Sequence, residues 1–239
     1  MLVAAAVCPA PPLLVPEVAA GAAAELGAAR TACSDALAVL AASRPDLLVV
    51  VGAVVGAAGQ EDEGPYPPGS RGTFRGFGVD ADVQLGEGGT GPRPLPVPLA
   101  VGAWLLGHAR WGAAPVEGLG VRESLETPRC LEAGRELAGR KARVALLVMG
   151  DGSACRTLKA PGYLDERAAG FDAGAARALG AADTAALAAL DAGLAAELQA
   201  AGRAPWQVLA GAAEGAGLDG RLLYEDAPYG VGYFVAAWS

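Results

Sequence analysis

The segment Val144–Asp172 reads VALLVMGDGSACRTLKAPGYLDERAAGFD, and it decides the fold class. Its first six residues are all apolar, which is typical of a strand buried on both faces of a sheet. The strand ends at residues 150–152, so the residues just beyond its carboxyl end are Ser153, Ala154 and Cys155. Open α/β sheets bind their ligands at this edge, and the segment therefore predicts where a functional site lies.

Strand-like and helix-like segments alternate through the rest of the chain. Strands are predicted at residues 2–7, 44–52, 73–79, 81–85, 114–121, 144–149, 221–227 and 229–238. Helices are predicted at residues 18–42, 98–108, 165–179, 183–201 and 205–215, with another that starts at Thr127 as its N-cap. This alternation predicts an α/β protein with a central mixed, largely parallel sheet and helices on both faces.

The chain is expected to form a single domain over residues 1–239. Of its 239 residues, 53% are hydrophobic and 18% are charged, which is enough apolar material for one large core. The stretch at about 57–72 is rich in glycine, proline and acidic residues. Such a composition is typical of an irregular surface loop.

Charge and cysteine usage exclude several classes of protein. The formal net charge of −8 argues against a nucleic-acid partner, because binding to phosphates requires clustered lysine and arginine. The apolar runs are too short to span a membrane. The proline-rich start lacks the basic region of an export signal, and the four cysteines form no CxxC pair. These features favour a cytoplasmic protein without a membrane partner, and they are compatible with a homo-oligomer.

The residue types near the predicted edge offer few groups for catalysis. Asp151 and Ser153 occupy the turn after a strand, where Asp151 serves either a pocket or the local turn geometry. Glu214 is either a buried carboxylate that needs a partner or an exposed residue at a helix end. The single histidine, His108, ends a predicted helix, which favours a surface role and makes a Ser-His-Asp triad improbable.

Four stretches resemble the class III extradiol ring-cleavage dioxygenase superfamily, which includes the Memo-like group. They are VCPAPPLLVPE at 7–17, RPDLLVVVGAV at 44–54, residues 149–172, and LAGAAEGAGLDGRLLYEDAPYGVGYFVA at 209–236. In active members, histidines that follow two strands hold non-haem Fe(II) together with a carboxylate, and a further histidine acts as acid and base. The resemblance implies the same fold and a site built for small aromatic substrates.

The positions that match those histidines carry no imidazole in this chain. The first metal ligand falls at Ala10, the second at Val54 and the acid–base histidine at Ala154. The carboxylate ligand falls at Glu214, with Glu225 as a weaker candidate. One carboxylate cannot hold Fe(II) against water. The resemblance therefore implies a degenerate member for which no cofactor is expected.

Two thiols lie close in sequence to the lost positions. Cys8 precedes Ala10 by two residues, and Cys155 follows Ala154 directly. They either form a thiol or soft-metal site in one cleft or are small buried residues of an Ala-rich core.

The sequence thus favours a metal-free scaffold or small-molecule-binding protein that uses the vestigial cleft. The alternatives are a metal-independent or thiol-based enzyme that uses Asp151, Ser153, Cys155 and Glu214, and a regulatory subunit that binds a protein partner.

Overall fold

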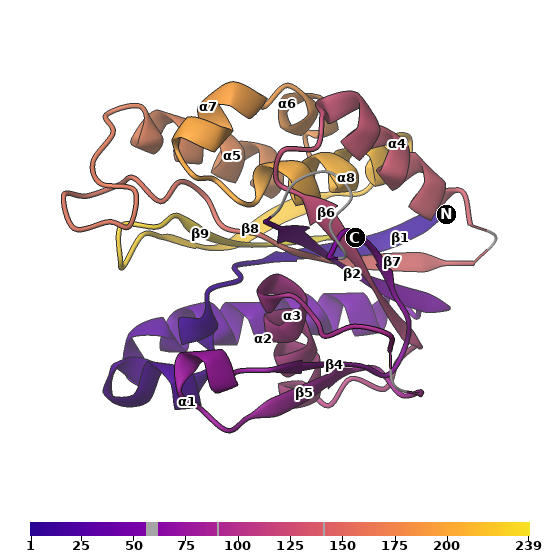
Figure 1. The fold of residues 1–239 in the computed structure, drawn as a ribbon. Coiled ribbons are helices and arrows are strands. Elements are labelled where there is room, and N and C mark those ends of the chain that lie inside the picture. The colour runs from indigo at the N-terminus through magenta and orange to yellow at the C-terminus, as the bar shows by residue number, and fades with distance from the viewer. Residues whose placement is uncertain (56–61, 90, 141) are drawn as a thin grey trace.

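A seven-stranded sheet runs through the middle of the molecule (Figure 1). The computed structural model describes residues 1–55, 62–89, 91–140 and 142–239. The strand order is β3-β6-β2-β7-β1-β9-β8. The strands are β1 (Leu2–Cys8), β2 (Leu47–Val54), β3 (Gly64–Tyr66), β6 (Val116–Arg122), β7 (Val144–Met149), β8 (Gly220–Asp226) and β9 (Tyr233–Trp238).

The centre of the sheet is parallel. The strands β6, β2, β7 and β1 run in one direction, while β3 and β9 are antiparallel to their inner neighbours. All six residues of β7 are buried, as expected for a strand covered on both faces. The predicted mixed, largely parallel sheet is confirmed, and the carboxyl ends of β6, β2, β7 and β1 meet at one edge.

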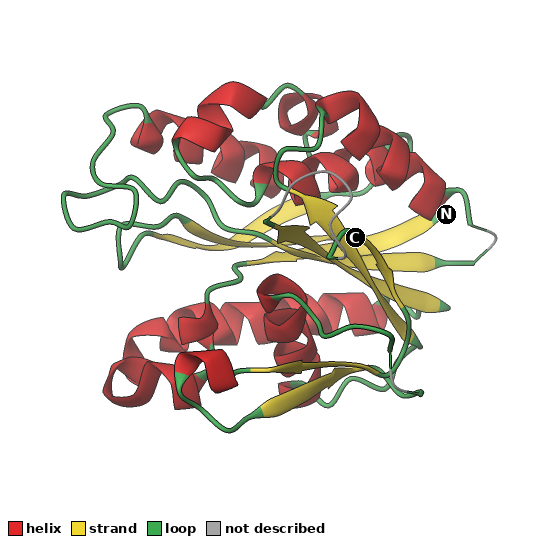
Figure 2. Cartoon of the chain, in the orientation of Figure 1, coloured by secondary structure: helices red, strands yellow, loops and turns green. Residues whose placement is uncertain are grey.

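Helices cover both faces of the sheet (Figure 2). One face carries α4 (Thr127–Ala138), α5 (Ala168–Gly180), α6 (Thr184–Ala188), α7 (Ala192–Glu197) and α8 (Arg203–Ala213). The other carries α1 (Pro16–Ala19), α2 (Gly27–Ala42) and α3 (Val97–His108), with 3₁₀ helices at η1 (Pro12–Leu14) and η2 (Ala20–Leu26). A second sheet, β4 (Ser70–Thr73) with β5 (Asp82–Leu85), packs outside α3, and η3 (Arg75–Phe77) lies between its strands.

Two predicted helices are interrupted. The helix expected at 18–42 breaks at Ala20, whose φ of 47° lies in the left-handed region, and α2 begins only at Gly27. The helix expected at 183–201 divides into α6 and α7, because Asp183 and Asp191 each accept a backbone N–H and so cap a new helix. The N-cap of α4 is Glu126 rather than the predicted Thr127.

The stretch predicted as an irregular loop at about 57–72 is partly ordered into strands. Residues 57–61 lie outside the described residues. Residues 64–66 form β3, which pairs with the outer edge of β6, and Ser70 begins β4. Pairing with an open strand edge outweighs the loop-like composition here.

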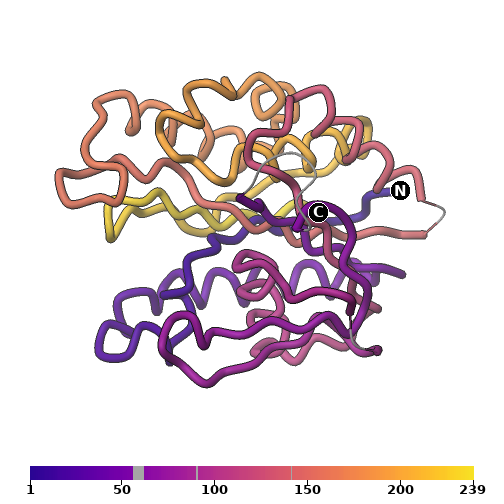
Figure 3. The backbone as a smooth tube through the Cα atoms, in the orientation of Figure 1, coloured from indigo at the N-terminus to yellow at the C-terminus, as the bar shows by residue number. Residues whose placement is uncertain are grey.

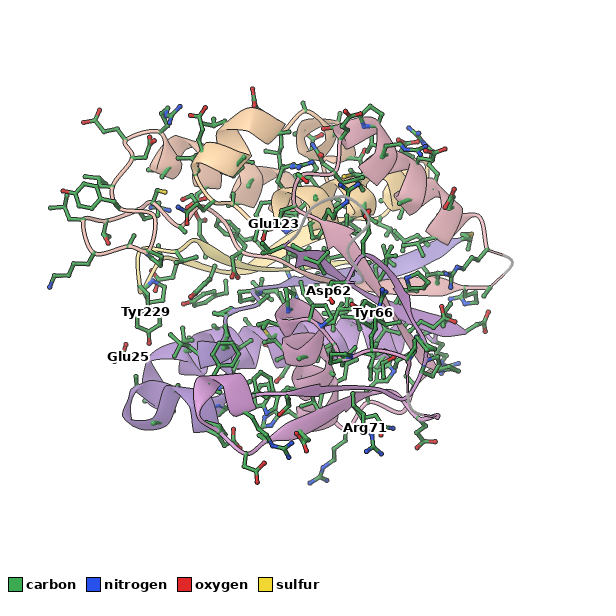
Figure 4. All side chains as sticks on the ribbon, in the orientation of Figure 1. Glu25, Asp62, Tyr66, Arg71, Glu123 and Tyr229 are labelled. Atoms are coloured by element: carbon green, nitrogen blue, oxygen red, sulfur yellow. The ribbon has the colours of Figure 1, made fainter. Side chains whose placement is uncertain are left out.

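A long loop, residues 150–167, leaves β7 and projects from the carboxyl edge of the sheet before α5 begins (Figure 3). The turn between β8 and β9 lies at the same edge. Its Tyr229 hydroxyl donates to Glu25 of η2 over 2.8 Å (Figure 4). No helix among the described residues has the length and apolar character to cross a membrane.

Candidate functional site at the carboxyl edge of the sheet

The positions that the resemblance assigns to imidazoles lie at the carboxyl edge and are apolar. Ala10 follows β1, Val54 ends β2 and Ala154 follows β7; all three are buried. Within the described residues, no three His, Cys, Asp or Glu side chains are grouped to hold a metal ion. The side chains present at this edge therefore do not fit a facial-triad Fe(II) site.

Asp151 lies two residues beyond the end of β7, at this edge of the sheet. Its Oδ1 accepts the backbone N–H of Ala10 over 2.8 Å, so the side chain reaches across to β1 and does not serve only its own turn. Its carbonyl oxygen accepts the N–H of Gly202 over 2.7 Å. Burial raises the pKa of Asp151 to about 7; the Ala10 N–H opposes this shift, and the negative charge of Glu123 adds to it.

Glu123, which the sequence analysis missed, directly follows β6 at the same edge (Figure 4). Its backbone carbonyl accepts a hydrogen bond from the buried guanidinium of Arg203, which also donates to Leu125 O and Gln207 Oε1. Burial raises the pKa of Glu123, and the nearby Arg203 charge lowers it. Neither Glu123 nor Asp151 forms an ion pair within the described part of the chain.

A pocket of about 670 Å³ opens beside Glu123. Its walls come from the end of β2, the start of the segment after β6, helix α7 and the turn into α8: Val55, Glu123, Ser124, Ala192, Gly193, Ala195, Ala196, Gln199, Ala200 and Arg203. The N–H of Gly202, next to this wall, holds the Asp151 backbone. Only the backbone of Asp151 contacts the turn into α8; its carboxyl group points to Ala10 and does not line the pocket.

Tyr233 is a second polar residue that the sequence analysis missed. It begins β9, and continuing the antiparallel register from Val7 opposite Ala236 brings Tyr233 level with Ala10. The residue is 3% exposed and packs in the apolar cluster on the α2 and α3 face, across the sheet from the pocket. Burial raises its pKa well above the usual range, and the charge of Asp151 adds to the shift. Tyr233 therefore keeps its proton at neutral pH.

Ser153 serves the loop rather than the site. It is fully buried, and both its N–H and its Oγ donate to Asp172 of α5 over 2.8 Å. Arg156 completes the group with an ion pair of 2.9 Å to Asp172 Oδ2. With its hydroxyl held in this way, Ser153 is not placed as a nucleophile.

The two thiols near the lost positions do not share a cleft. Cys8 packs in the apolar cluster on the α2 and α3 face, together with Cys33 of α2. Cys155 packs in the cluster on the α5 and α8 face. The hypothesis of a shared thiol site is therefore wrong, because the sheet separates the two side chains.

Cys155 is expected to react with iodoacetamide at neutral pH as slowly as a buried structural cysteine. Its pKa is raised by burial first and then by the charges of Asp165 and Asp172, so little thiolate forms. Its Sγ lies 3.5 Å from the carbonyl oxygens of Gly162 and Leu198. Peptide mass spectrometry after timed labelling checks this, and rapid labelling at pH 6 that requires Arg156 would contradict it.

Glu214 does not belong to the site. Helix α8 begins beside Asp151 and runs about 16 Å along the sheet, at 1.5 Å per residue, before Glu214 ends it. There its two oxygens accept from Arg135 of α4 over 2.7 and 2.8 Å in an exposed ion pair. The position of Glu214 therefore does not fit the carboxylate ligand that the resemblance implies, and its interpretation as an exposed residue at a helix end is correct.

The remaining candidates are surface residues. Glu225 is exposed on the outermost strand β8. His108 is exposed at the end of α3 and stacks on Trp104 with ring centroids 5.1 Å apart. The surface role predicted for His108 is confirmed.

The raised pKa of Asp151 predicts a pH-dependent stability. An acid whose pKa rises from 3.8 to about 7 on folding stabilises the fold while protonated, and that contribution is lost as pH rises toward 7. Asp151→Asn keeps the acceptor for Ala10 but cannot ionise. We expect this variant to gain, relative to the natural protein, on the order of 2 kcal/mol between about pH 5 and pH 8 in urea unfolding. An equal pH dependence in both proteins would contradict the assignment.

Comparisons with known proteins bear on the fold alone. No family model matches the chain, and no curated protein matches it. Among solved structures, an uncharacterized protein from Escherichia coli K12 matches over 99% of both chains with a TM-score of 0.54 and 15% sequence identity. The fold is thus similar over the whole length, and this likeness carries no statement about activity.

Proposed function

We propose that this protein binds a small molecule at the carboxyl edge of its sheet and is a catalytically degenerate member of the extradiol-dioxygenase-like proteins that its sequence resembles. The observation that carries the proposal is the set of polar groups at that edge. Glu123 and the guanidinium of Arg203 line a pocket of about 670 Å³, and Asp151 lies at the same edge outside that lining; neither acid has an ion-pair partner in the described chain. The volume is in the range of small-molecule sites.

The purified protein is expected to contain no stoichiometric iron and to cleave no catechol. The positions that would have to supply imidazoles are Ala10, Val54 and Ala154, which offer no metal ligand. Elemental analysis, together with an assay on protocatechuate after anaerobic Fe(II) loading and exposure to O₂, tests this. Close to one iron per chain, or ring cleavage, would overturn the degenerate assignment.

Ligand binding itself is tested by a fragment library observed through backbone amide shifts. Fragments that bind in the pocket should shift the amides of Glu123, Ala196, Gln199 and Arg203 together, since these residues come from separate elements that line it. Shifts confined to the pocket at the amino end of β6, which Trp111 and Val116 line, would place binding elsewhere. A library that shifts neither set would argue against a binding protein.

A metal-independent enzyme is the second candidate, and one observation favours it. A carboxyl whose pKa is raised to about 7 is suited to donate and accept protons at neutral pH. In this alternative Asp151 is the general acid or base. Ser153 and Cys155 have no part in it, because the hydroxyl is bonded to Asp172 and the thiol is buried.

A further inference from the structure

Arg203 is a buried cation that lines the pocket beside Glu123. It begins α8 and is 3% exposed. Its Nη1 donates to Leu125 O over 2.6 Å and to Gln207 Oε1 over 3.0 Å, and its Nη2 donates to Glu123 O. All three acceptors are uncharged oxygens. Arg203 takes part in no ion pair within the described part of the chain.

These oxygens satisfy N–H groups but do not neutralise the charge of Arg203. A buried charge is costly unless an opposite charge lies close to it. The helix adds to the cost, because Arg203 lies in the first turn of α8, at the positive end of the helix dipole. That turn contains no acidic residue and has no side-chain cap. An anionic group in the pocket would therefore stabilise Arg203.

The guanidinium also keeps N–H donors for a ligand. Arginine has more N–H groups than the three bonds use, and the N–H of Nε and the second N–H of Nη2 have no acceptor among the described residues. Nε is not one of the enclosed nitrogens without a partner, so it is accessible from the pocket that Arg203 lines. A carboxylate accepts from such donors in short, charge-assisted hydrogen bonds.

The rest of the lining limits the size and charge of the ligand. It contains one acid, Glu123, the uncharged polar residues Ser124 and Gln199, and otherwise only alanine, glycine and valine. With one cation in the lining, a single negative charge is matched and a second would be repelled by Glu123. Glu123 is exposed, so water screens its repulsion more than it screens the attraction of the buried Arg203.

We propose that this pocket binds a small aliphatic monocarboxylate whose carboxylate lies against the guanidinium of Arg203, an inference that rests on the proposed function. The ligand supplies the counter-charge that the described chain does not give to Arg203. Its short apolar body lies against the alanine-rich wall from α7 and the turn into α8. Glu123 weakens the binding and selects against a second anionic group.

The experiment compares four aliphatic probes of five carbons: valerate, pentanamide, pentylamine and glutarate. Each is titrated into the natural protein at about pH 7.5, where the carboxylates are ionised, and the Kd is read from the amide shifts of Ala196, Gln199 and Arg203. Valerate is expected to bind best, about tenfold more tightly than pentanamide, as for a charge-assisted hydrogen bond. Pentanamide or pentylamine binding as tightly as valerate would overturn carboxylate recognition. Glutarate binding more tightly would overturn the preference for a single charge.

Arg203→Met tests the cation directly, since methionine keeps an apolar side chain of similar length but has no charge. The variant should lose the preference for valerate over pentanamide. Circular dichroism checks its fold, because Arg203 also holds the segment after β6 through Glu123 O and Leu125 O. A folded Arg203→Met protein that still prefers valerate would contradict the proposal.

Glu123→Gln keeps the proposal testable if Arg203→Met does not fold. It retains the backbone carbonyl that binds Arg203 and removes one negative charge from the pocket. Valerate should bind about threefold more tightly to it, and pentanamide equally well. Glu225→Gln is the matched control and should change neither Kd, because Glu225 is exposed on the outermost strand β8. Valerate binding that is insensitive to Glu123→Gln would place the carboxylate outside this pocket.

The outcome also distinguishes this inference from the proposed function. If none of the four probes shifts the pocket amides but other library fragments do, carboxylate recognition is wrong and the binding function stands. If no fragment shifts them, the binding function itself is wrong.

Discussion

Replacing Asp172 with alanine is expected to lower the free energy of unfolding by about 3 kcal/mol or more. The Asp172 side chain is fully buried and accepts three hydrogen bonds: from Ser153 N–H, Ser153 Oγ and Arg156 Nη1. Ser153 is also fully buried, so the substitution leaves two donors without partners. Each buried donor without a partner costs about 1–3 kcal/mol, and Arg156 loses its counter-charge.

Urea unfolding of Asp172→Ala measures this loss, and Glu197→Ala is the matched control. Glu197 also pairs with an arginine, Arg167, but its side chain is 60% exposed. An exposed ion pair contributes about 0–1 kcal/mol, so the control should unfold almost like the natural protein. Equal effects of the two substitutions would contradict a structural role for Asp172.

A local measurement shows where the Asp172 variant loosens. The three bonds of Asp172 tie the start of the 150–167 loop to α5, and this loop contains Arg156 and Lys159. Trypsin should therefore cleave the variant within this loop faster than elsewhere, under conditions in which most molecules remain folded. Faster cleavage spread evenly over the chain would indicate only global unfolding.

The fold could be predicted from the sequence because its strands are buried on both faces. The run at 144–149 has no polar residue to interrupt it, and the same holds for most of β2. Such runs identify a covered parallel sheet without any knowledge of the partners. The boundary between α6 and α7 could not be predicted in the same way. Asp183 and Asp191 each cap a new helix, but the Ala-rich sequence around them has the pattern of one continuous helix.

The candidate site could be predicted only in part. Asp151 was identifiable because it follows a buried strand, and the same rule applied to the strand at 114–121 would have drawn attention to Glu123. Tyr233 gave no such signal, since its position depends on the pairing of β9 with β1. Alternation could have decided between the two interpretations of Cys8, because Ala4, Ala6 and Cys8 share one face of β1 and that face packs against α2.

Glu214 was misplaced for a different reason. A resemblance aligns residues along the chain, whereas the position of Glu214 depends on the direction of the helix that precedes it. Helix α8 starts at the carboxyl edge and carries Glu214 away from it, to Arg135 at the end of α4. Helices α4 and α8 cross closely, with a glycine of each helix against the backbone of the other.

Gly134→Ala is expected to destabilise the protein by about 2–3 kcal/mol, although alanine is the better helix former by about 1 kcal/mol. A Cβ at Gly134 would overlap the carbonyl oxygen of Val208 and lie 2.6 Å from the nitrogen of Ala212, both backbone atoms of α8. Gly211 of α8 meets the backbone of Leu131 in the same way. Neither helix can relieve the contact by changing a rotamer, so the pair must separate and lose packing.

Gly174→Ala in α5 is the matched control for Gly134→Ala, because a Cβ at Gly174 would meet nothing within 4 Å. In that helix interior the same substitution should raise the free energy of unfolding by about 0.5–1 kcal/mol. Thermal or urea unfolding of the two variants should thus give changes of opposite sign. If Gly134→Ala were also stabilising, α4 and α8 could not cross with their backbones in contact. The path of α8 that carries Glu214 away from Asp151 would then be wrong.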